Sequence, residues 1–581
     1  MGTDWLVPLG FIVCFLMAMC MGANDVANAF GTSVGSGVIT MRQAFCIAAV
    51  MNVLGAVSMS GAVTQTIRKG IVDLKKFAPS GEGDVGKPEE LQLLMLCAMI
   101  GTVSYVTLAT IKAMPVSTTQ AVLGGIVGAM LAFNGPSGVL WVSEGGVCEY
   151  SRETSRFSCG GVVGIVLQWF FAPLISMAFA MILFLVSSKL LLTVEPALAL
   201  KRAPPMMAFA VGAISFALAW FIVVQQQHHP HTRGWDPRDV ADPVNHATAL
   251  EVLFCILIGV TTAYLTLTVF SVYPEVLTFT PADYAMGRTG VAEAAVADAY
   301  AAVDEPGARE ERRIEAEAAR SVEMVSAKSP MVDDDSPSTF HSAFEDQDAE
   351  AAMDHISLDE PPPRNTSSAA VRDSAPGPDQ IEIFTGEIHD DTRAAHASAR
   401  TYDPAVEKVF GSAQICSAAL SAFAAGANDI ANEVAPIAAI WQTQRQGFVA
   451  ANVRTPRWLY AYAGLGVAVG LAMFGKRVMR TVGRDCTKIT PSRGFNIELG
   501  YSLASLISSA EGWRAPAPVS TTQLCIGAVV GVALVSGEDV SKSLNRKLLF
   551  TIFCSWVLTP FMSGIISAIC FACLRPALGA P

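Results

Sequence analysis

Charged residues are scarce in this 581-residue chain. Asp, Glu, Lys and Arg together make up 15% of it, against about 25% in an average soluble protein, whereas hydrophobic residues make up 52%. This balance excludes a disordered chain, a coiled coil and a typical cytosolic enzyme. Thirteen cysteines in a chain of this length do not suggest a disulfide scaffold. The net charge of −12 gives no indication of a basic face for nucleic acid.

The acidic residues are concentrated in one segment. Residues 274–405 carry 28 acidic and 10 basic side chains, whereas the rest of the chain carries 23 and 29. The segment is also rich in Ala, Pro and Ser, and such a composition cannot bury enough apolar surface to offset the entropy of ordering. We therefore expect a disordered acidic linker, which is either a plain tether or a regulatory, partner-binding element.

About twelve apolar stretches flank this segment. Most of them approach 20 residues, the length at which a helix crosses the hydrocarbon core of a bilayer, about 30 Å thick. Aromatic residues near their ends, such as Trp5, Trp220 and Trp458, suit the membrane interface. Charged amphipathic helices, which would surround buried core helices in a soluble protein, are not found. The sequence therefore predicts an all-α, multi-pass membrane protein.

The two apolar parts of the chain share motifs. Gly-Ala-Asn-Asp-Val-Ala-Asn at 22–28 is matched by Gly-Ala-Asn-Asp-Ile-Ala-Asn at 426–432. Pro-Val-Ser-Thr-Thr-Gln occurs both at 115–120 and at 518–523. The order of the motifs is the same in both parts, and their spacing differs by one residue. Repetition of this kind indicates an internal duplication.

The second motif of each copy lies between two short apolar segments. Segments of about 12 residues are too short to span a bilayer comfortably, and a polar tip after a proline suits two half-helices that meet inside the membrane. Exposed backbone at that depth is tolerated only where it lines a protein cavity. We therefore expect re-entrant helical hairpins near 91–133 and 497–536. An odd number of crossings then precedes the second copy, so the two repeats are inverted.

The domain boundaries follow from these features. Each repeat should contain about five helical segments. The predicted parts are a first repeat at 1–187, two connecting transmembrane helices at 188–273, the linker at 274–405, and a second repeat at 406–581. Basic residues in the loop 475–494 place that loop and the linker in the cytoplasm and both termini outside. Cys148 and Cys159 would then share an outside loop and could form a disulfide.

Two carboxylates lie at membrane depth, where an ionisable group is costly and usually functional. They are Asp25 and Asp429, and each is followed three residues later, on the same helical face, by Asn28 or Asn432. Carboxylate and amide oxygens are the ligands that hard cations take, so we predict sodium ligands here. The glycine that opens each motif should permit local unwinding that frees backbone carbonyls. The alternative is polar packing between helices.

The hairpin tips offer hydroxyl and amide donors at the start of a half-helix, where free N–H groups favour an anion. Two such tips could hold a tetrahedral oxyanion between them; the alternative is ordinary helix capping. The predicted anion ligands are Ser117, Thr118, Thr119, Gln120, Ser520, Thr521, Thr522 and Gln523. Because the nearby carboxylates would repel an anion, cations bound at Asp25 and Asp429 would remove the conflict, which predicts coupled transport.

The chain resembles the inorganic phosphate transporter family of sodium- or proton-coupled phosphate symporters. The resemblance rests on the two duplicated motifs, on Thr-Ile-Arg-Lys-Gly at 66–70 and on Arg-Gly-Phe-Asn-Ile-Glu at 493–498. It implies phosphate at the hairpin tips, sodium at the Asn-Asp motifs, a transport-linked acidic residue at Glu498, and a homodimer. Asn52 departs from the family pattern, which often has Glu there, and Ala435-Pro436 replaces Gly-Pro.

We therefore expect a secondary active symporter, not an enzyme, that imports inorganic phosphate with sodium. A proton-coupled phosphate symporter, a sulfate symporter of the same fold, and a phosphate sensor that does not transport are the alternatives. The expected partners are phosphate, sodium or protons, the lipid bilayer and a second copy of the chain, without nucleic acid and without a cofactor beyond the transported sodium. The plasma membrane is the default location, and an acidic organelle is the alternative.

Overall fold

The computed structural model describes most of the two apolar parts of the chain. The described residues are 3–77, 87–142, 148–151, 156–159, 161–227, 249–272, 392, 396, 399–449, 455–509, 518–537 and 543–578. The chain divides into two units, one formed by Met1–Asp298 with Gly377–Pro581 and the other by Ala299–Pro376. Everything described below belongs to the first unit. The predicted linker at 274–405 lies almost wholly outside the described residues and stays a prediction.

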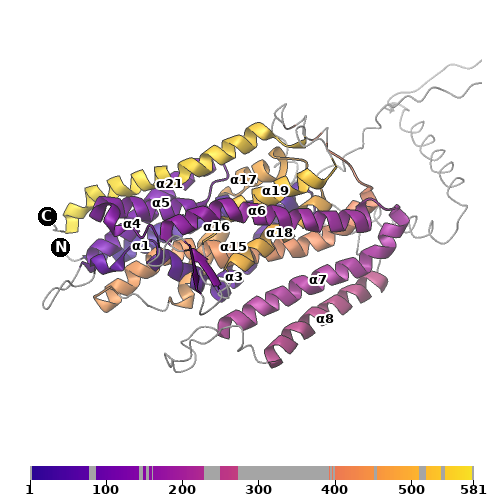
Figure 1. The fold of residues 1–581 in the computed structure, drawn as a ribbon, viewed down its shortest axis with the longest axis horizontal. Helices are drawn as coiled ribbons and strands as arrows, with labels where there is room; N and C mark the ends of the chain where they lie inside the picture. Colours follow the sequence, from indigo (N-terminus) through magenta and orange to yellow (C-terminus); the bar gives the residue numbers. More distant parts are fainter. Residues whose placement is uncertain are drawn as a thin grey trace, which may run out of the picture. The chain divides into compact units, whose positions relative to one another are not determined.

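Helices dominate the described residues (Figure 1). The part before the linker contains α1 (Leu6–Met21), the π-helical turn η2 (Gly22–Val26), α2 (Ala27–Gly35), α3 (Met41–Gly70), α4 (Pro88–Ile111), α5 (Thr118–Asn134), α6 (Gly161–Ser187), α7 (Pro196–Gln227) and α8 (Ala249–Val272). The part after it contains α15 (Pro404–Gln446), α16 (Arg457–Phe474), α17 (Lys476–Arg480), the π-helical turn η7 (Thr481–Asp485), α18 (Pro491–Ser509), α19 (Thr521–Val535) and α21 (Arg546–Leu574).

A short antiparallel hairpin is the exception to the helical fold. It pairs β1 (Cys148–Ser151) with β2 (Arg156–Cys159), and its register sets Cys148 opposite Cys159. This backbone pairing is compatible with the predicted disulfide, which stays a prediction.

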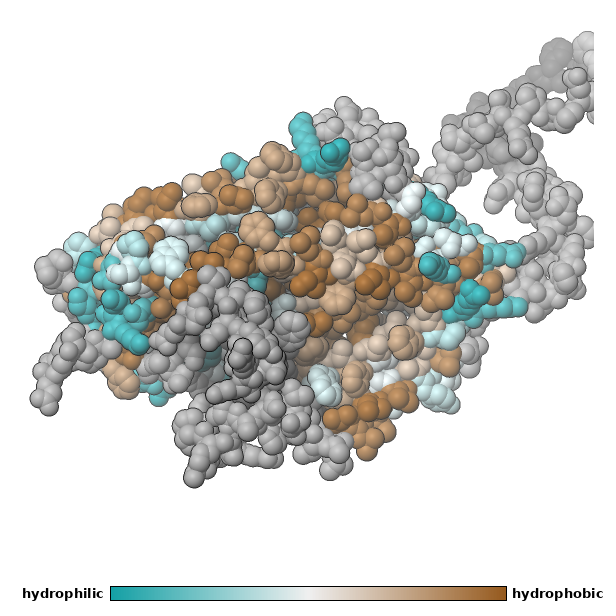
Figure 2. All heavy atoms as spheres, in the orientation of Figure 1, coloured by the Kyte–Doolittle hydropathy of each residue, from teal (hydrophilic) through white to brown (hydrophobic). Residues whose placement is uncertain are grey.

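Ten helical segments of the described chain are long and apolar enough to cross a membrane. Figure 2 shows an apolar band over the middle of the molecule, with hydrophilic residues toward its two ends. Large apolar side chains such as Phe209, Tyr264 and Phe550 are 69–75% exposed, as lipid-facing side chains are. The predicted multi-pass helical membrane protein is confirmed.

The lengths of the helices correct one detail of the sequence analysis. The segment after the first Ser-Thr-Thr-Gln motif has a short apolar core, but α5 and the turn that follows it form a candidate span of 21 residues, Thr118–Gly138. α5 itself has 17 residues and its counterpart α19 has 15. The two helices thus differ by two residues, and the turn Gly135–Gly138 extends the span in the first copy.

Both termini of the first unit lie at the same end (Figure 1). Near the start of the chain, Asp4 Oδ1 accepts a hydrogen bond from Gln444 Nε2 at 3.0 Å, at the end of α15. Near the other terminus, Arg575 Nη2 lies 3.1 Å from Glu90 Oε1, at the start of α4. This agrees with the prediction that the termini share a side of the membrane.

The helices that carry the two Asn-Asp motifs run antiparallel. The start of α1 meets the end of α15, as described above. Further along, Cys14 Sγ lies 3.6 Å from the backbone carbonyl oxygen of Glu433, and Ser36 Oγ, just beyond α2, donates to Gln414 Oε1 at 2.9 Å. As the residue number rises along α1 and α2, the number of the contacting residue on α15 falls. The helices are therefore antiparallel, and the two motifs lie beside each other.

The motif glycines are required for close packing. A Cβ at Gly22 would overlap the backbone carbonyl of Val467 in α16, and a Cβ at Gly426 would overlap that of Asn52 in α3. The expectation of unwinding was wrong for the second copy, because α15 is α-helical throughout the motif. In the first copy, Gly22 opens the π-helical turn η2. Asn52, where family members often carry Glu, thus contributes backbone to a helix contact.

Candidate functional site

The site is built where α5 and α19 begin. Ser117 Oγ accepts a hydrogen bond from Gln120 N at 3.2 Å, and Ser520 Oγ accepts one from Gln523 N at 3.3 Å. Both serines therefore cap a helix, which was the alternative interpretation of these residues. The eight predicted anion ligands are all at most 4% exposed. The burial of two matched polar tips in a membrane protein exceeds what capping requires.

Two asparagines hold the extended segments before the tips. Asn24 Nδ2 donates to the carbonyl of Met114 at 3.0 Å, and Asn24 Oδ1 accepts from Val116 N at 2.9 Å. In the second copy, Asn428 Nδ2 donates to the carbonyl of Val519 at 2.6 Å. This role of the two asparagines was not predicted from the sequence. An Asn precedes both aspartates, and this repetition hinted at a role, but the hydrogen-bond partners of the asparagines depend on the fold.

Each aspartate accepts hydrogen bonds from a Ser-Thr-Thr-Gln motif, which is called a tip from here on. Asp25 Oδ2 accepts from the Thr118 hydroxyl and, at 3.3 Å, from its backbone N–H. Asp429 Oδ2 accepts from Thr521 Oγ1 at 2.6 Å. Asp25 Oδ1 also accepts from Thr522 Oγ1, on the tip of the other copy, at 2.9 Å. The predicted cation ligands and the predicted anion ligands are thus in direct contact.

The two copies also exchange equivalent contacts. Asn28 Nδ2 donates to Thr522 Oγ1 at 2.9 Å, and Asn432 Nδ2 donates to Thr119 Oγ1 at 3.0 Å. Thr119 Oγ1 in turn donates to the backbone carbonyl oxygen of the valine before the other tip, at 3.4 Å. The equivalent carbonyl oxygen lies 3.1 Å from Thr522 Oγ1, whose single proton it shares with Asp25. Matching residues of the duplicated motifs therefore lie around one common centre.

Four amide oxygens at this centre have no hydrogen-bond partner among the described residues. They are Asn28 Oδ1, Asn432 Oδ1, Gln120 Oε1 and Gln523 Oε1, and all four are buried. A buried oxygen without a partner costs about 1–3 kcal/mol, and amide oxygens are ligands for hard cations. The part of the chain that the structure describes holds no cluster of three or more His, Cys, Asp or Glu residues. The oxygen-rich donor set therefore suits sodium better than a transition metal.

Glu498 occupies a separate buried position on α18. Its carboxylate accepts hydrogen bonds from Thr32 Oγ1 at 2.6 Å, Ser33 Oγ at 2.5 Å, Ser417 Oγ at 2.6 Å and Gln414 Nε2 at 3.3 Å. These donors come from α2 and α15. The structure therefore links Glu498 to both motif helices without bringing it to the Ser-Thr-Thr-Gln motifs.

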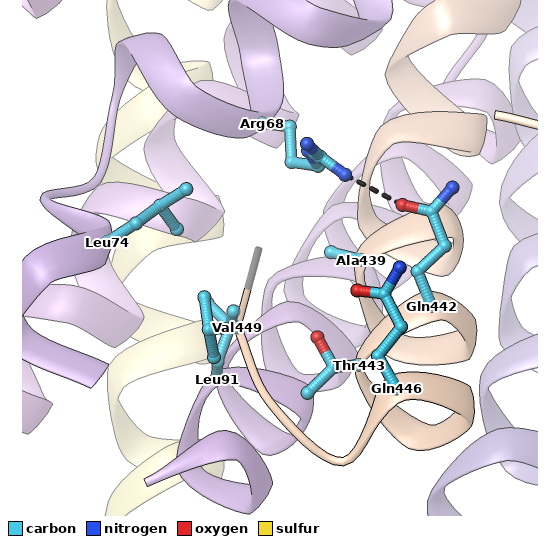
Figure 3. Close-up of a pocket in the computed structure, with 8 residues that line it drawn as sticks. All are labelled: Arg68, Leu74, Leu91, Ala439, Gln442, Thr443, Gln446 and Val449. Carbon is cyan, nitrogen blue, oxygen red and sulfur yellow. Dashed lines mark hydrogen bonds between the residues drawn. The ribbon is translucent and has the colours of Figure 1, made fainter. Parts of the chain in front are cut away.

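A small pocket near the end of α15 is distinct from this centre (Figure 3). Arg68 of α3 points toward α15 there and donates from Nη1 to Gln442 Oε1 at 2.7 Å. Gln442 follows Asp429 by 13 residues, or about 20 Å along a helix that rises 1.5 Å per residue. The pocket is therefore too far away to belong to the predicted site.

A helical membrane protein with a buried, duplicated, oxygen-lined centre has the architecture of a solute transporter. The chain belongs to the phosphate transporter family, whose model matches residues 21–567. The family resemblance inferred from the motifs is thereby confirmed.

Individual relatives agree with this assignment. The chain is 28% identical to the phosphate-repressible phosphate permease pho-4 of Neurospora crassa, over 97% of this chain and 96% of that protein. It is 27% identical to the sodium-dependent phosphate transporter 2 of Felis catus, over 99% and 98%. A solved structure titled "The sodium-dependent phosphate transporter" shares the fold, with a TM-score of 0.61, 23% identity and coverage of 98% of this chain and 99% of that one. These relatives are transporters and not enzymes.

Proposed function

We propose that this protein is a symporter that imports inorganic phosphate together with sodium, with both solutes bound where the two copies meet. The observation that carries the proposal is the exchange of contacts between copies, Asn28 with Thr522 and Asn432 with Thr119. A centre of this kind opens to either side if one copy rocks against the other. The name of the Felis catus relative supports sodium as the coupled ion.

The proposed architecture is a pair of inverted repeats, each with a re-entrant hairpin. Antiparallel packing of α1 and α2 against α15 supports the inversion, because the same motif then approaches the centre from opposite directions. The hairpins would consist of α4 with α5 and of α18 with α19, each pair joined at a Ser-Thr-Thr-Gln tip. The starts of α5 and α19 lie at the centre, and the positive end of a helix favours an anion.

Sodium would act by releasing the tip hydroxyls. Asp25 and Asp429 now accept hydrogen bonds from threonine hydroxyls. A sodium ion on each carboxylate, with the amide oxygens of Asn28 and Asn432 as further ligands, would compete for the same oxygens. The hydroxyls of both tips could then donate to phosphate oxygens, with Gln120 and Gln523 beside them.

The charge at the centre explains why the two solutes would bind together. Among the described residues, the hydrogen-bond donors to both aspartates are hydroxyl, amide and backbone groups. Lys112, the basic residue closest in sequence to the first tip, is exposed. Two like charges about 4 Å apart repel by about 4 kcal/mol at an effective dielectric constant near 20. Phosphate beside uncompensated carboxylates would meet such repulsion, and bound cations would remove it.

The test is uptake of radiolabelled phosphate into proteoliposomes, with sodium, potassium and pH gradients imposed separately. The proposal predicts accumulation driven by a sodium gradient at constant pH. Accumulation driven by pH alone would favour proton coupling, full competition by sulfate would broaden the substrate class, and binding without uptake would indicate a sensor. The proposal also includes location in the plasma membrane, which imaging of the protein in cells would test. It further includes assembly as a homodimer, which a mass measurement of the protein in detergent would test.

A further inference from the structure

One buried carboxylate takes no part in the network described so far. Glu433 lies on α15, its side chain is fully buried, and both of its carboxylate oxygens lack a hydrogen-bond partner among the described residues. The other buried acids near the centre differ in this respect, because Asp25, Asp429 and Glu498 each accept at least two hydrogen bonds. Glu433 therefore needs a separate explanation.

The surroundings of Glu433 are acidic and apolar. It follows Asp429 by four residues, so both side chains lie on one face of α15, and Asp25 of η2 is also within electrostatic range. On α1, Cys14 Sγ lies 3.6 Å from the backbone carbonyl oxygen of Glu433.

A carboxylate in this position requires a ligand. Buried charges in proteins are paired or coordinate a metal ion. A neutral carboxyl group would still leave a buried donor and a buried acceptor without partners. A small hard cation would satisfy both oxygens and would also offset the repulsion from Asp25 and Asp429.

We infer that Glu433 supplies the carboxylate of a further sodium site, additional to those at Asp25 and Asp429. This site has no counterpart in the first copy, where Ala29 occupies the matching position of the motif. The inference rests on the proposed sodium coupling and extends it, because a third carboxylate at the centre takes a third cation. The duplicated centre thus carries one asymmetric cation site.

The test counts sodium ions bound to the full-length protein. Radiolabelled sodium would be measured by equilibrium dialysis of purified protein with saturating phosphate, at constant pH. Glu433→Gln keeps the side-chain volume, and Glu433→Ala places on α15 the residue that the first copy already has. Both variants are expected to bind one sodium ion fewer per protomer than the parent, and sodium activation of phosphate uptake should become less steep.

A matched control is Glu407→Gln, which alters a buried acid near the start of the same helix. Ser492 already donates to both oxygens of Glu407, so the sodium count should not change. A parent-like count in Glu433→Gln would overturn the inference and leave sodium coupling intact, whether or not the pH dependence of uptake changes. A parent protein that binds no sodium would instead overturn the proposed coupling, and the inference with it.

Discussion

The two copies of the duplicated motifs are alike at the centre of the molecule and different immediately beside it. At the centre, Asn28 and Asn432 reach across to matching threonines at 2.9 and 3.0 Å. Beside it, the first motif lies on a π-helical turn between two helices, whereas the second lies within one continuous 43-residue helix. The contacts between the copies are therefore more alike than the helices that support them.

The largest effect is expected when one carboxylate at a time is removed, which tests whether the two copies are equivalent. Asp25→Asn and Asp429→Asn should each lower sodium-dependent phosphate uptake at least about tenfold, since 1.4 kcal/mol of lost binding already corresponds to a factor of ten. If the copies are equivalent in function, both variants lose activity, although Asp25 contacts both tips and Asp429 contacts one. Initial uptake rates in proteoliposomes would measure this, and sodium-dependent uptake that stays at the parent level in both would refute it.

The matched glycines test whether the helix contacts are equivalent. Gly22→Ala and Gly426→Ala each force a methyl group into a backbone carbonyl of a neighbouring helix, and overpacking of this kind costs about 1–3 kcal/mol. Both variants should melt at a lower temperature in detergent. Gly70→Ala is the control, because a Cβ there would make an ordinary contact at 3.6 Å. A melting temperature equal to that of the control would contradict the packing role.

The tip threonines test an asymmetry inside the centre. The single hydroxyl proton of Thr522 lies between Asp25 Oδ1, at 2.9 Å, and a backbone carbonyl oxygen, at 3.1 Å, whereas Thr119 Oγ1 donates to a carbonyl oxygen at 3.4 Å. A hydrogen bond to a charged group is stronger than one to a neutral group, so Thr522→Val should destabilise the protein without bound solutes more than Thr119→Val does, by about 0.5–1.5 kcal/mol. Melting temperatures in detergent without sodium and phosphate measure this difference. Equal effects of the two substitutions would contradict the asymmetry.

The smallest expected effect concerns a contact outside the membrane helices. His396 Nε2 lies 2.8 Å from the backbone carbonyl oxygen of Arg484, and burial lowers the pKa of His396. Since the ordinary value is about 6.5, the unfolded segment takes up a proton first as the pH falls, and the docked state loses stability below that pH. The protection factor of amides near His396, which corrects for slower intrinsic exchange at lower pH, should fall between pH 7 and 5, and His396→Asn should abolish this fall.

The sequence predicted the components of the centre but not their connections. Repeated polar motifs in apolar stretches were sufficient to predict Asp25, Asp429 and the two tips as site residues, because polar residues at membrane depth are costly and usually functional. Which threonine meets which carboxylate depends on how the antiparallel helices pack, and that information is not local. The exchange between copies was therefore not predictable from spacing.

The glycines and Glu433 illustrate two further limits. A glycine suits both local unwinding and close helix packing, since both depend on the missing Cβ, so the sequence could not distinguish these roles. Glu433 stood next to a predicted ligand, yet only the structure reveals a buried carboxylate without hydrogen-bond partners among the described residues.

The central claim is that phosphate binds beside Asp25 and Asp429 only when cations accompany it. Titration calorimetry of purified protein with phosphate, at constant pH and increasing sodium with choline as the replacement ion, tests it most directly. The account predicts that phosphate affinity rises at least about tenfold with sodium and that Asp25→Asn weakens this dependence. Phosphate binding of equal affinity in the absence of sodium would contradict it.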